Sequence, residues 1–319
     1  MQKRDHNQAG ITAQDGLMLG LVVVWGANFS VLKLGLDVMP PQLFNGIRMA
    51  MAAVIFVVFL AVQGGLRWRR EDTLKIMGLG LIGHAGYQIL FIEGLSRTAV
   101  GNSALMLASV PMWVAIIGAA LGYERLSRSG WIGIGLAFAG VAAVIIGSNQ
   151  SFSADSLLGD GLTLVATLCW SGYTAFSQPL LTRYSPVQLS GMSLTAAVPV
   201  LALAGILAPP GLAYDWGRFN VEALLALLFG GILSVNVCYV IWYRGVQKLG
   251  GARTAIFSNI TPLVAIVVAW VWRDEPLQPV YAVGAVLIAG GVLMTRFSRP
   301  SVPHRAVVAA EADSAVGTG

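Results

Sequence analysis

The chain has 319 residues, of which 56% are hydrophobic and only 11% are charged, and its mean hydropathy is +0.73. A water-soluble protein cannot bury so large an apolar fraction, so this composition excludes two ordinary soluble domains and indicates a chain embedded in lipid. The formal net charge of +5 gives no reason to expect a nucleic-acid partner, because its distribution fits a membrane protein better.

About ten apolar stretches approach the roughly 20 residues that a helix needs to cross a bilayer. The first is too long for a cleaved signal peptide and lacks a cleavage site. We therefore expect an all-α integral membrane protein with ten transmembrane helices, a cytoplasmic tail at 1–14 and a disordered cytoplasmic tail at 298–319. The expected spans lie near 16–38, 42–63, 74–95, 99–121, 129–147, 158–182, 187–208, 221–245, 252–272 and 277–296.

Basic residues are divided unevenly between the two sides of the expected membrane. One side carries only Lys33, Arg97, Arg218 and Arg273, whereas the other side and the tails carry most of the remaining lysines and arginines. Because basic loops stay in the cytoplasm, this bias predicts a plasma-membrane (inner-membrane) protein with both termini cytoplasmic. The two cysteines, Cys169 and Cys238, lie in apolar runs, so we expect no disulfide, metal or cofactor.

The sequence contains an internal repeat. The stretches SVPMWVAIIGAALGYERL (109–126) and ITPLVAIVVAWVWRDEPL (260–277) share the order of a proline, an apolar run and a charged cluster that contains glutamate. Further matched landmarks predict two five-helix repeats, 15–147 and 148–297. Because each half has an odd number of spans, the second repeat must be inverted, which is a recurring design of secondary transporters with a central substrate site.

The matched prolines, Pro111 and Pro262, each remove a backbone donor within an apolar span. Polar backbone freed in this way is tolerated at membrane depth where protein or a wet cavity satisfies it. A static kink would explain a single proline, but the pair in inverted repeats favours a hinge or a cavity-lining role.

The stretch WGANFSVLKLGLDVMPPQLFNGIRMAMA resembles the first two helices of the EamA family of the drug/metabolite transporter superfamily. The stretch GGARTAIFSNITPLVAIVVAWVWRDEPLQPVYAVGAVLIAGGVL resembles its last two helices, and the resemblance extends over about residues 15–297. The resemblance implies ten helices in two inverted halves and the export or exchange of small metabolites. It does not fix the substrate, and the glutamate clusters depart from the commoner LGE spelling.

Polar and aromatic residues inside the spans are candidates for the substrate site. Trp25 with Asn28 and Trp170 with Tyr173 recur at helical spacing, which suits a pocket for small amphipathic molecules, although ordinary packing explains them almost as well. His84 with Tyr87 matches Asn236 with Tyr239 in the other half. His84 could carry a coupling proton or simply hydrogen-bond to a neighbouring helix. The ninth expected substrate-binding residue is Asn259, shortly before the second hinge proline.

Charged residues near the span ends receive more ordinary interpretations. We expect Arg48 to extend to the membrane interface rather than to contact an anionic substrate. Lys33 and Glu93 are expected to be interfacial charges rather than a gate pair, and Glu275, like Glu124, to act in capping or loop pairing. Small residues at every fourth position, Gly135, Ala139, Ala143 and Gly147, predict close helix packing between the halves or in a homodimer.

The combined prediction is a membrane transporter, not an enzyme, that exports or exchanges amino acids or related metabolites by alternating access. We expect it to contact membrane lipid and to bind a small-molecule substrate. Coupling of transport to protons is left open by the sequence. A multidrug-type efflux carrier is the main alternative. A membrane-embedded enzyme is disfavoured because no clustered carboxylates or nucleophile motifs occur at depth, and a channel because no filter segment occurs.

Overall fold

The structure is a computed structural model that describes residues 13–65, 69–121, 127–147, 153–209, 213–249, 254–255 and 257–297, with only the backbone described for 295–297. Within these ranges the chain is helical and contains no strand. The first half consists of α1 (Ala13–Leu36), α2 (Pro41–Val62), η1 (Arg70–Asp72), α3 (Thr73–Leu79), η2 (Gly80–Gly86), α4 (Tyr87–Arg97), α5 (Val100–Leu107), α6 (Val110–Ala120) and α7 (Arg128–Gly147). The second half consists of α8 (Ala154–Ser177), η3 (Leu180–Thr182), α9 (Pro186–Leu207), η5 (Trp216–Arg218), α10 (Val221–Leu228), η6 (Phe229–Val237), α11 (Cys238–Leu249), η7 (Ser258–Ile260), α13 (Thr261–Arg273) and α14 (Pro279–Phe297).

These helices confirm the predicted fold class. Among the described residues, 7 helical segments are long and apolar enough to cross a membrane, and two shorter apolar helices cover Ser258–Arg273 and Pro279–Met294. The 24-residue α8 adds the tenth span, although Asp155 and Asp160 near its start lower its hydropathy. The described part of the chain starts with α1 at Ala13, so residues 1–12 of the expected tail at 1–14 and the whole expected tail at 298–319 lie outside the described residues.

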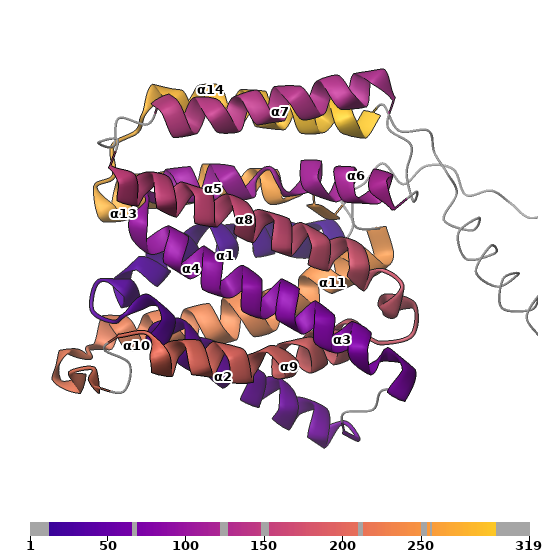
Figure 1. The fold of residues 1–319 in the computed structure, drawn as a ribbon, viewed down its shortest axis with the longest axis vertical. Helices are drawn as coiled ribbons and strands as arrows, with labels where there is room; N and C mark the ends of the chain where they lie inside the picture. Colours follow the sequence, from indigo (N-terminus) through magenta and orange to yellow (C-terminus); the bar gives the residue numbers. More distant parts are fainter. Residues whose placement is uncertain are drawn as a thin grey trace, which may run out of the picture.

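The two halves interlock through equivalent helices. Helix α2 packs against its counterpart α9, and α7 packs against its counterpart α14. Helices α7 and α14 together form an outer layer at one side of the molecule (Figure 1). Helix α1 packs on α13 of the second half, and α8 packs on α5 and α6 of the first half. Because helices of each half pack on helices of the other half, residues of both repeats meet at the centre of the molecule.

Both halves contain a π-helical segment at the same place, in the third span of each repeat. Segment η2 holds His84 and packs on α9, whereas η6 holds Asn236 and packs on α2. Glycines allow the close contact: a Cβ at Gly80 would meet the backbone of α9 at Ser193, and one at Gly231 would lie 3.2 Å from the carbonyl oxygen of Arg48. Such segments occur frequently at functional sites, because the wider turn leaves backbone groups less regularly paired.

The matched prolines lie next to helix breaks rather than inside continuous helices. Pro111 lies in the first turn of α6, after the interruption that ends α5, and Pro262 lies in the first turn of α13, after η7. Proline is tolerated there because the first-turn amides have no intrahelical acceptor. In each half a serine bonds to a nearby carbonyl: Ser109 donates to Met106 over 2.6 Å, and Ser258 donates to Ala255 over 2.5 Å.

The contact between α7 and α14 uses only some of the small residues that were expected. A Cβ at Gly140 would lie 3.0 Å from the carbonyl oxygen of Gly284, and buried Ala137 faces Gly291. Gly135 and Ala139 of the predicted stripe are exposed on the outer face, and a Cβ at Gly135 would meet nothing within 4 Å. Gly147 of the stripe does contact Val280 of α14, so the two helices pack together through this end of the stripe and through Gly140 and Ala137.

Candidate functional site

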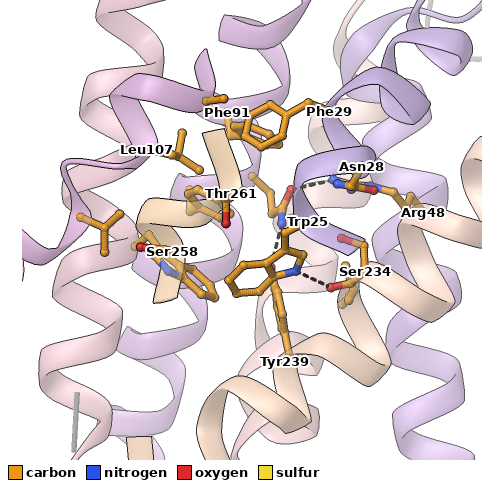
Figure 2. Close-up of a pocket in the computed structure, with 16 residues that line it drawn as sticks. Trp25, Asn28, Phe29, Arg48, Phe91, Leu107, Ser234, Tyr239, Ser258 and Thr261 are labelled. Carbon is orange, nitrogen blue, oxygen red and sulfur yellow. Dashed lines mark hydrogen bonds between the residues drawn. The ribbon is translucent and has the colours of Figure 1, made fainter. Parts of the chain in front are cut away.

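A cavity of about 60 Å³ lies between the two repeats. Five of the nine expected site residues line it: Trp25 and Asn28 of α1, Tyr87 of α4, Trp170 of α8 and Tyr239 of α11 (Figure 2). Further lining residues come from the helix breaks and the π segment, namely Leu107, Val110, Ser234, Val235, Ser258 and Thr261. The cavity is therefore built from both halves of the chain, at the place that an inverted repeat predicts.

Aromatic rings form one wall of the cavity. Trp25 lies at the centre of this wall, with ring centroids 5.8 Å from Trp170, 6.4 Å from Tyr239 and 5.3 Å from Trp242. Its indole nitrogen donates to the carbonyl oxygen of Ser234 in η6 over 3.0 Å, which fixes the ring between the two halves. The π segment thus supplies a backbone acceptor that anchors the central tryptophan.

The sequence-based interpretation of Arg48 was wrong. Its side chain is only 1% exposed and lines the cavity instead of extending to the membrane interface. The Nη2 atom donates to Oδ1 of Asn45 over 2.8 Å and to Oε1 of Gln88 over 2.6 Å. Gln88 in turn donates to the Tyr239 hydroxyl over 2.9 Å, so the network joins both repeats.

His84 and Tyr173 lie together, adjacent to the cavity lining rather than in it. The Tyr173 hydroxyl lies 2.7 Å from Nε2 of His84 and 2.9 Å from the Ser193 hydroxyl, which is itself 3.0 Å from Nε2. The imidazole also stacks on Tyr239, with ring centroids 5.3 Å apart. His84 is fully buried, and its Nδ1 has no hydrogen-bond partner among the described residues.

The remaining two expected residues lie away from the cavity. The amide of Asn236 donates to the carbonyl oxygen of Ala52 on α2 over 2.8 Å, which makes it a contact between the halves. Asn259 lines a separate pocket of about 10 Å³ with Pro262 and residues of α14. His84 and Asn236 of the two π segments thus both bond to the other half of the chain, and the aromatic residues that follow them, Tyr87 and Tyr239, line the cavity.

Polar contacts join the spans at the end of the molecule that we call the Lys33 end, formed by Lys33, Asp37, Arg97, Glu275 and Arg273. Lys33 donates to the carbonyl oxygen of Thr98 over 2.7 Å, so it does not pair with Glu93. Glu93 instead binds Arg97 at 2.6 Å. Asp37 forms an ion pair of 3.1 Å with Arg273, which joins the ends of α1 and α13.

The expected capping role of Glu275 is confirmed, because its carboxylate accepts a hydrogen bond of 3.1 Å from the amide of Val100, the first residue of α5. Glu124 lies outside the described residues. The opposite end of the molecule, which we call the Arg183 end, is formed by Glu71, Asp72, Lys75, Arg183 and Tyr184. There Arg183 and Tyr184 both bind the buried Asp72, at 3.1 and 2.8 Å.

The arrangement resembles a binding site more than a catalytic one. No group of three or more histidine, cysteine, aspartate or glutamate side chains is positioned to hold a metal ion in the part of the chain that the structure describes. The cavity instead combines aromatic faces with a few fixed polar groups, which is the usual character of a site for a small organic molecule.

Comparison with known proteins identifies the family. The profile of the EamA-like transporter family matches twice, over residues 13–146 and 157–297. The chain belongs to this family. The two matches correspond to the two halves of the structure, and they point to a transporter rather than an enzyme.

Relatives across bacteria and archaea bear transporter names. A probable amino-acid metabolite efflux pump of Escherichia coli (strain K12) is 28% identical, with 90% of this chain and 96% of that protein covered. A probable terminal-alkyne amino-acid exporter of Streptantibioticus cattleyicolor is 26% identical, with coverage of 86% and 91%. One solved crystal structure superposes with a TM-score of 0.64 at 19% identity, covering 88% of this chain and 96% of that one, which supports the fold alone.

Proposed function

We propose that this EamA transporter is a secondary carrier of the plasma membrane that exports or exchanges amino acids or related small metabolites by alternating access. Both termini lie in the cytoplasm in this proposal, and the Lys33 end faces outwards. The central cavity carries the proposal, because both inverted repeats contribute its walls. The names of the amino-acid exporters among its relatives support this substrate class.

The size of the cavity supports a conformational cycle. At about 60 Å³ it has room for a few water molecules, whereas ligand sites usually measure roughly 300–1,000 Å³. A metabolite therefore enters only after the halves move apart. The helix breaks near Pro111 and Pro262, one in each half, are our candidates for hinges in this movement. A substrate drives the change through its different affinity for the two states.

Counterflow in liposomes that contain the purified protein tests the proposal. The liposomes are loaded with a pooled mixture of amino acids and metabolites, and uptake is compared with that of empty liposomes, with and without a proton gradient. We expect exchange of amino acids above the background. Absence of exchange for every member of the pool would overturn the amino-acid assignment.

The same assay tests proton coupling through His84. The cluster of His84, Tyr173 and Ser193 is buried beside the cavity and contacts Tyr239, so a change in its protonation would reach the lining directly. Under this proposal a proton gradient enhances exchange, and His84→Ala loses the enhancement. Exchange that is equally fast without a gradient would exclude His84 from coupling but retain the carrier.

A multidrug-type efflux carrier is the second candidate function. The cluster of Trp25, Trp170 and Tyr239 favours it, since the faces of aromatic rings also bind cationic and aromatic drugs. Cationic dyes in the same liposomes separate the two candidates: exchange of dyes without exchange of amino acids would support the drug carrier.

A further inference from the structure

Arg48 is a buried charge without an opposite charge. It is about 10 Å along α2 from the Lys33 end, at 1.5 Å per residue, and only 1% of it is exposed. Its side-chain hydrogen bonds go to the neutral amides of Asn45 and Gln88, and within the described residues no carboxylate lies within ion-pair distance. A guanidinium stays protonated in proteins, and burying it unpaired costs several kcal/mol.

The surroundings of Arg48 hold the side chain in one place. Gly230 of η6 leaves room for it, because a Cβ there would lie 2.9 Å from Cδ of Arg48. Gln88, which accepts from Nη2, is itself fixed by the Tyr239 hydroxyl. The Nε atom of Arg48 is buried and has no partner among the described residues. The guanidinium is therefore positioned in advance and keeps hydrogen-bonding capacity beside the cavity.

We propose that Arg48 binds the carboxylate of the transported metabolite, an inference that rests on the proposed function and narrows its substrates to small monocarboxylates, including amino acids. A planar guanidinium pairs with a carboxylate through two parallel hydrogen bonds. Arg48 is the only Lys, Arg or His among the residues that line the described cavity, so it balances one negative charge. A phosphate dianion would leave a charge uncompensated in the membrane.

Other residues of the cavity lining are suited to bind the ammonium group of an amino acid. Asn28 Oδ1 and Thr261 Oγ1 are buried and without a partner among the described residues, and both residues line the cavity. Figure 2 shows Asn28 beside Arg48 and Thr261 on the other side of Trp25. These oxygens and the faces of Trp25 and Tyr239 can receive an ammonium group. A ligand with a positive charge alone, by contrast, is repelled by Arg48.

The test compares an exchanged amino acid with its primary amide, which keeps the side chain and the ammonium but lacks the carboxylate. Binding is measured through quenching of tryptophan fluorescence, because Trp25 and Trp170 line the cavity, and exchange is measured through counterflow. The wild type should prefer the acid on the order of 100-fold, the usual effect of removing one partner of a buried, hydrogen-bonded charge pair. In Arg48→Gln the preference should vanish, whereas Arg48→Lys should retain about a tenth of it.

The outcomes separate this inference from the proposed function. A wild type that exchanges an amino acid and its amide equally well would overturn the role of Arg48 and leave the carrier intact. A wild type that exchanges neither, while it exchanges cationic dyes, would overturn the amino-acid function itself. If Arg48→Gln does not fold, the acid-to-amide preference of the wild type and of Arg48→Lys still decides the question.

Discussion

Two serines of α9, Ser190 and Ser193, are both fully buried, but their hydroxyl groups have different surroundings. The Ser193 hydroxyl donates to the Leu189 carbonyl oxygen over 2.6 Å and contacts His84 and Tyr173. The Ser190 hydroxyl has no partner among the described residues. Because a hydrogen-bonded buried group stabilises the fold and an unpaired one does not, the two positions form a matched pair.

We predict that Ser193→Ala lowers the free energy of unfolding by about 1–2 kcal/mol, since it leaves His84 and Tyr173 with fewer partners. Ser190→Ala should leave it unchanged or raise it. Thermal unfolding in detergent, followed by loss of helical circular dichroism, measures both variants under the same conditions. Equal stability of the two variants would show that the hydroxyl cluster contributes nothing to the fold.

At the residue scale, side-chain type and helical spacing predicted residues that form the aromatic lining of the cavity. Trp25, Tyr87, Trp170 and Tyr239 could be identified because two similar halves repeat an aromatic residue at the same place. Arg48 was misinterpreted, because a long cationic side chain near a span end usually extends to the interface. The direction of the Arg48 side chain depends on Gly230 and Gly231 of η6, which lie about 180 residues further along the chain. Spacing within one helix contains no information on that contact.

At the scale of elements, the sequence predicted the ten spans, and it contained the matched prolines, but it did not predict the π segments. Apolar periodicity reports the length of a helix, whereas the wider turn at His84 and at Asn236 depends on packing against the other half. The same applies to α7, whose contacting face is decided by α14. A prediction from small residues alone could not distinguish Gly140 from Gly135, because both fit a stripe of close packing.

The helix breaks make a prediction about rate. Replacing Pro111 or Pro262 with alanine restores a backbone donor and allows the helix to continue through the break, so the halves should move less easily. We expect exchange to become several-fold slower, roughly, while the affinity for substrate stays the same. Initial rates of counterflow and the fluorescence-based dissociation constant measure these two quantities separately.

Pro199 provides the matched control for the hinge prediction. It lies inside α9 and faces outwards, and the helix continues from Pro186 to Leu207 without a break. Pro199→Ala should therefore leave the rate of exchange unchanged. If all three alanine variants transport at the wild-type rate, the breaks are static features of the packing and not hinges.

At the scale of the whole molecule, the two kinds of contact between the repeats have different characters. The pair α7 and α14 joins the halves through close apolar packing that includes Gly140, Gly284 and Gly291. The Lys33 end joins them through polar contacts, such as the ion pair of Asp37 and Arg273 and the bond from the Val100 amide to Glu275. Exposed ion pairs contribute only about 0–1 kcal/mol each, so they can open and close during a transport cycle.

This difference predicts that a crosslink at the Lys33 end stops transport, whereas one between α7 and α14 does not. The first variant replaces Asp37 and Arg273, whose side chains are 3.1 Å apart, with cysteines and joins them with a short thiol-reactive linker. The control replaces Gly147 and Val280, where a Cβ on Gly147 would lie 3.3 Å from that of Val280, close to the separation in a disulfide. Both are made with Cys169 and Cys238 changed to alanine, so that only the introduced thiols react.

Alternating access requires the Lys33 end to open once in each cycle, so counterflow through the crosslinked first variant should fall to the level of empty liposomes. The control should keep the rate that it has before oxidation, because α7 and α14 move little relative to each other in this mechanism. Full exchange with the Lys33 end locked would mean that substrate does not pass between Asp37 and Arg273 at all. The carrier would then have to open along another route, and the inverted-repeat mechanism would fail for this protein.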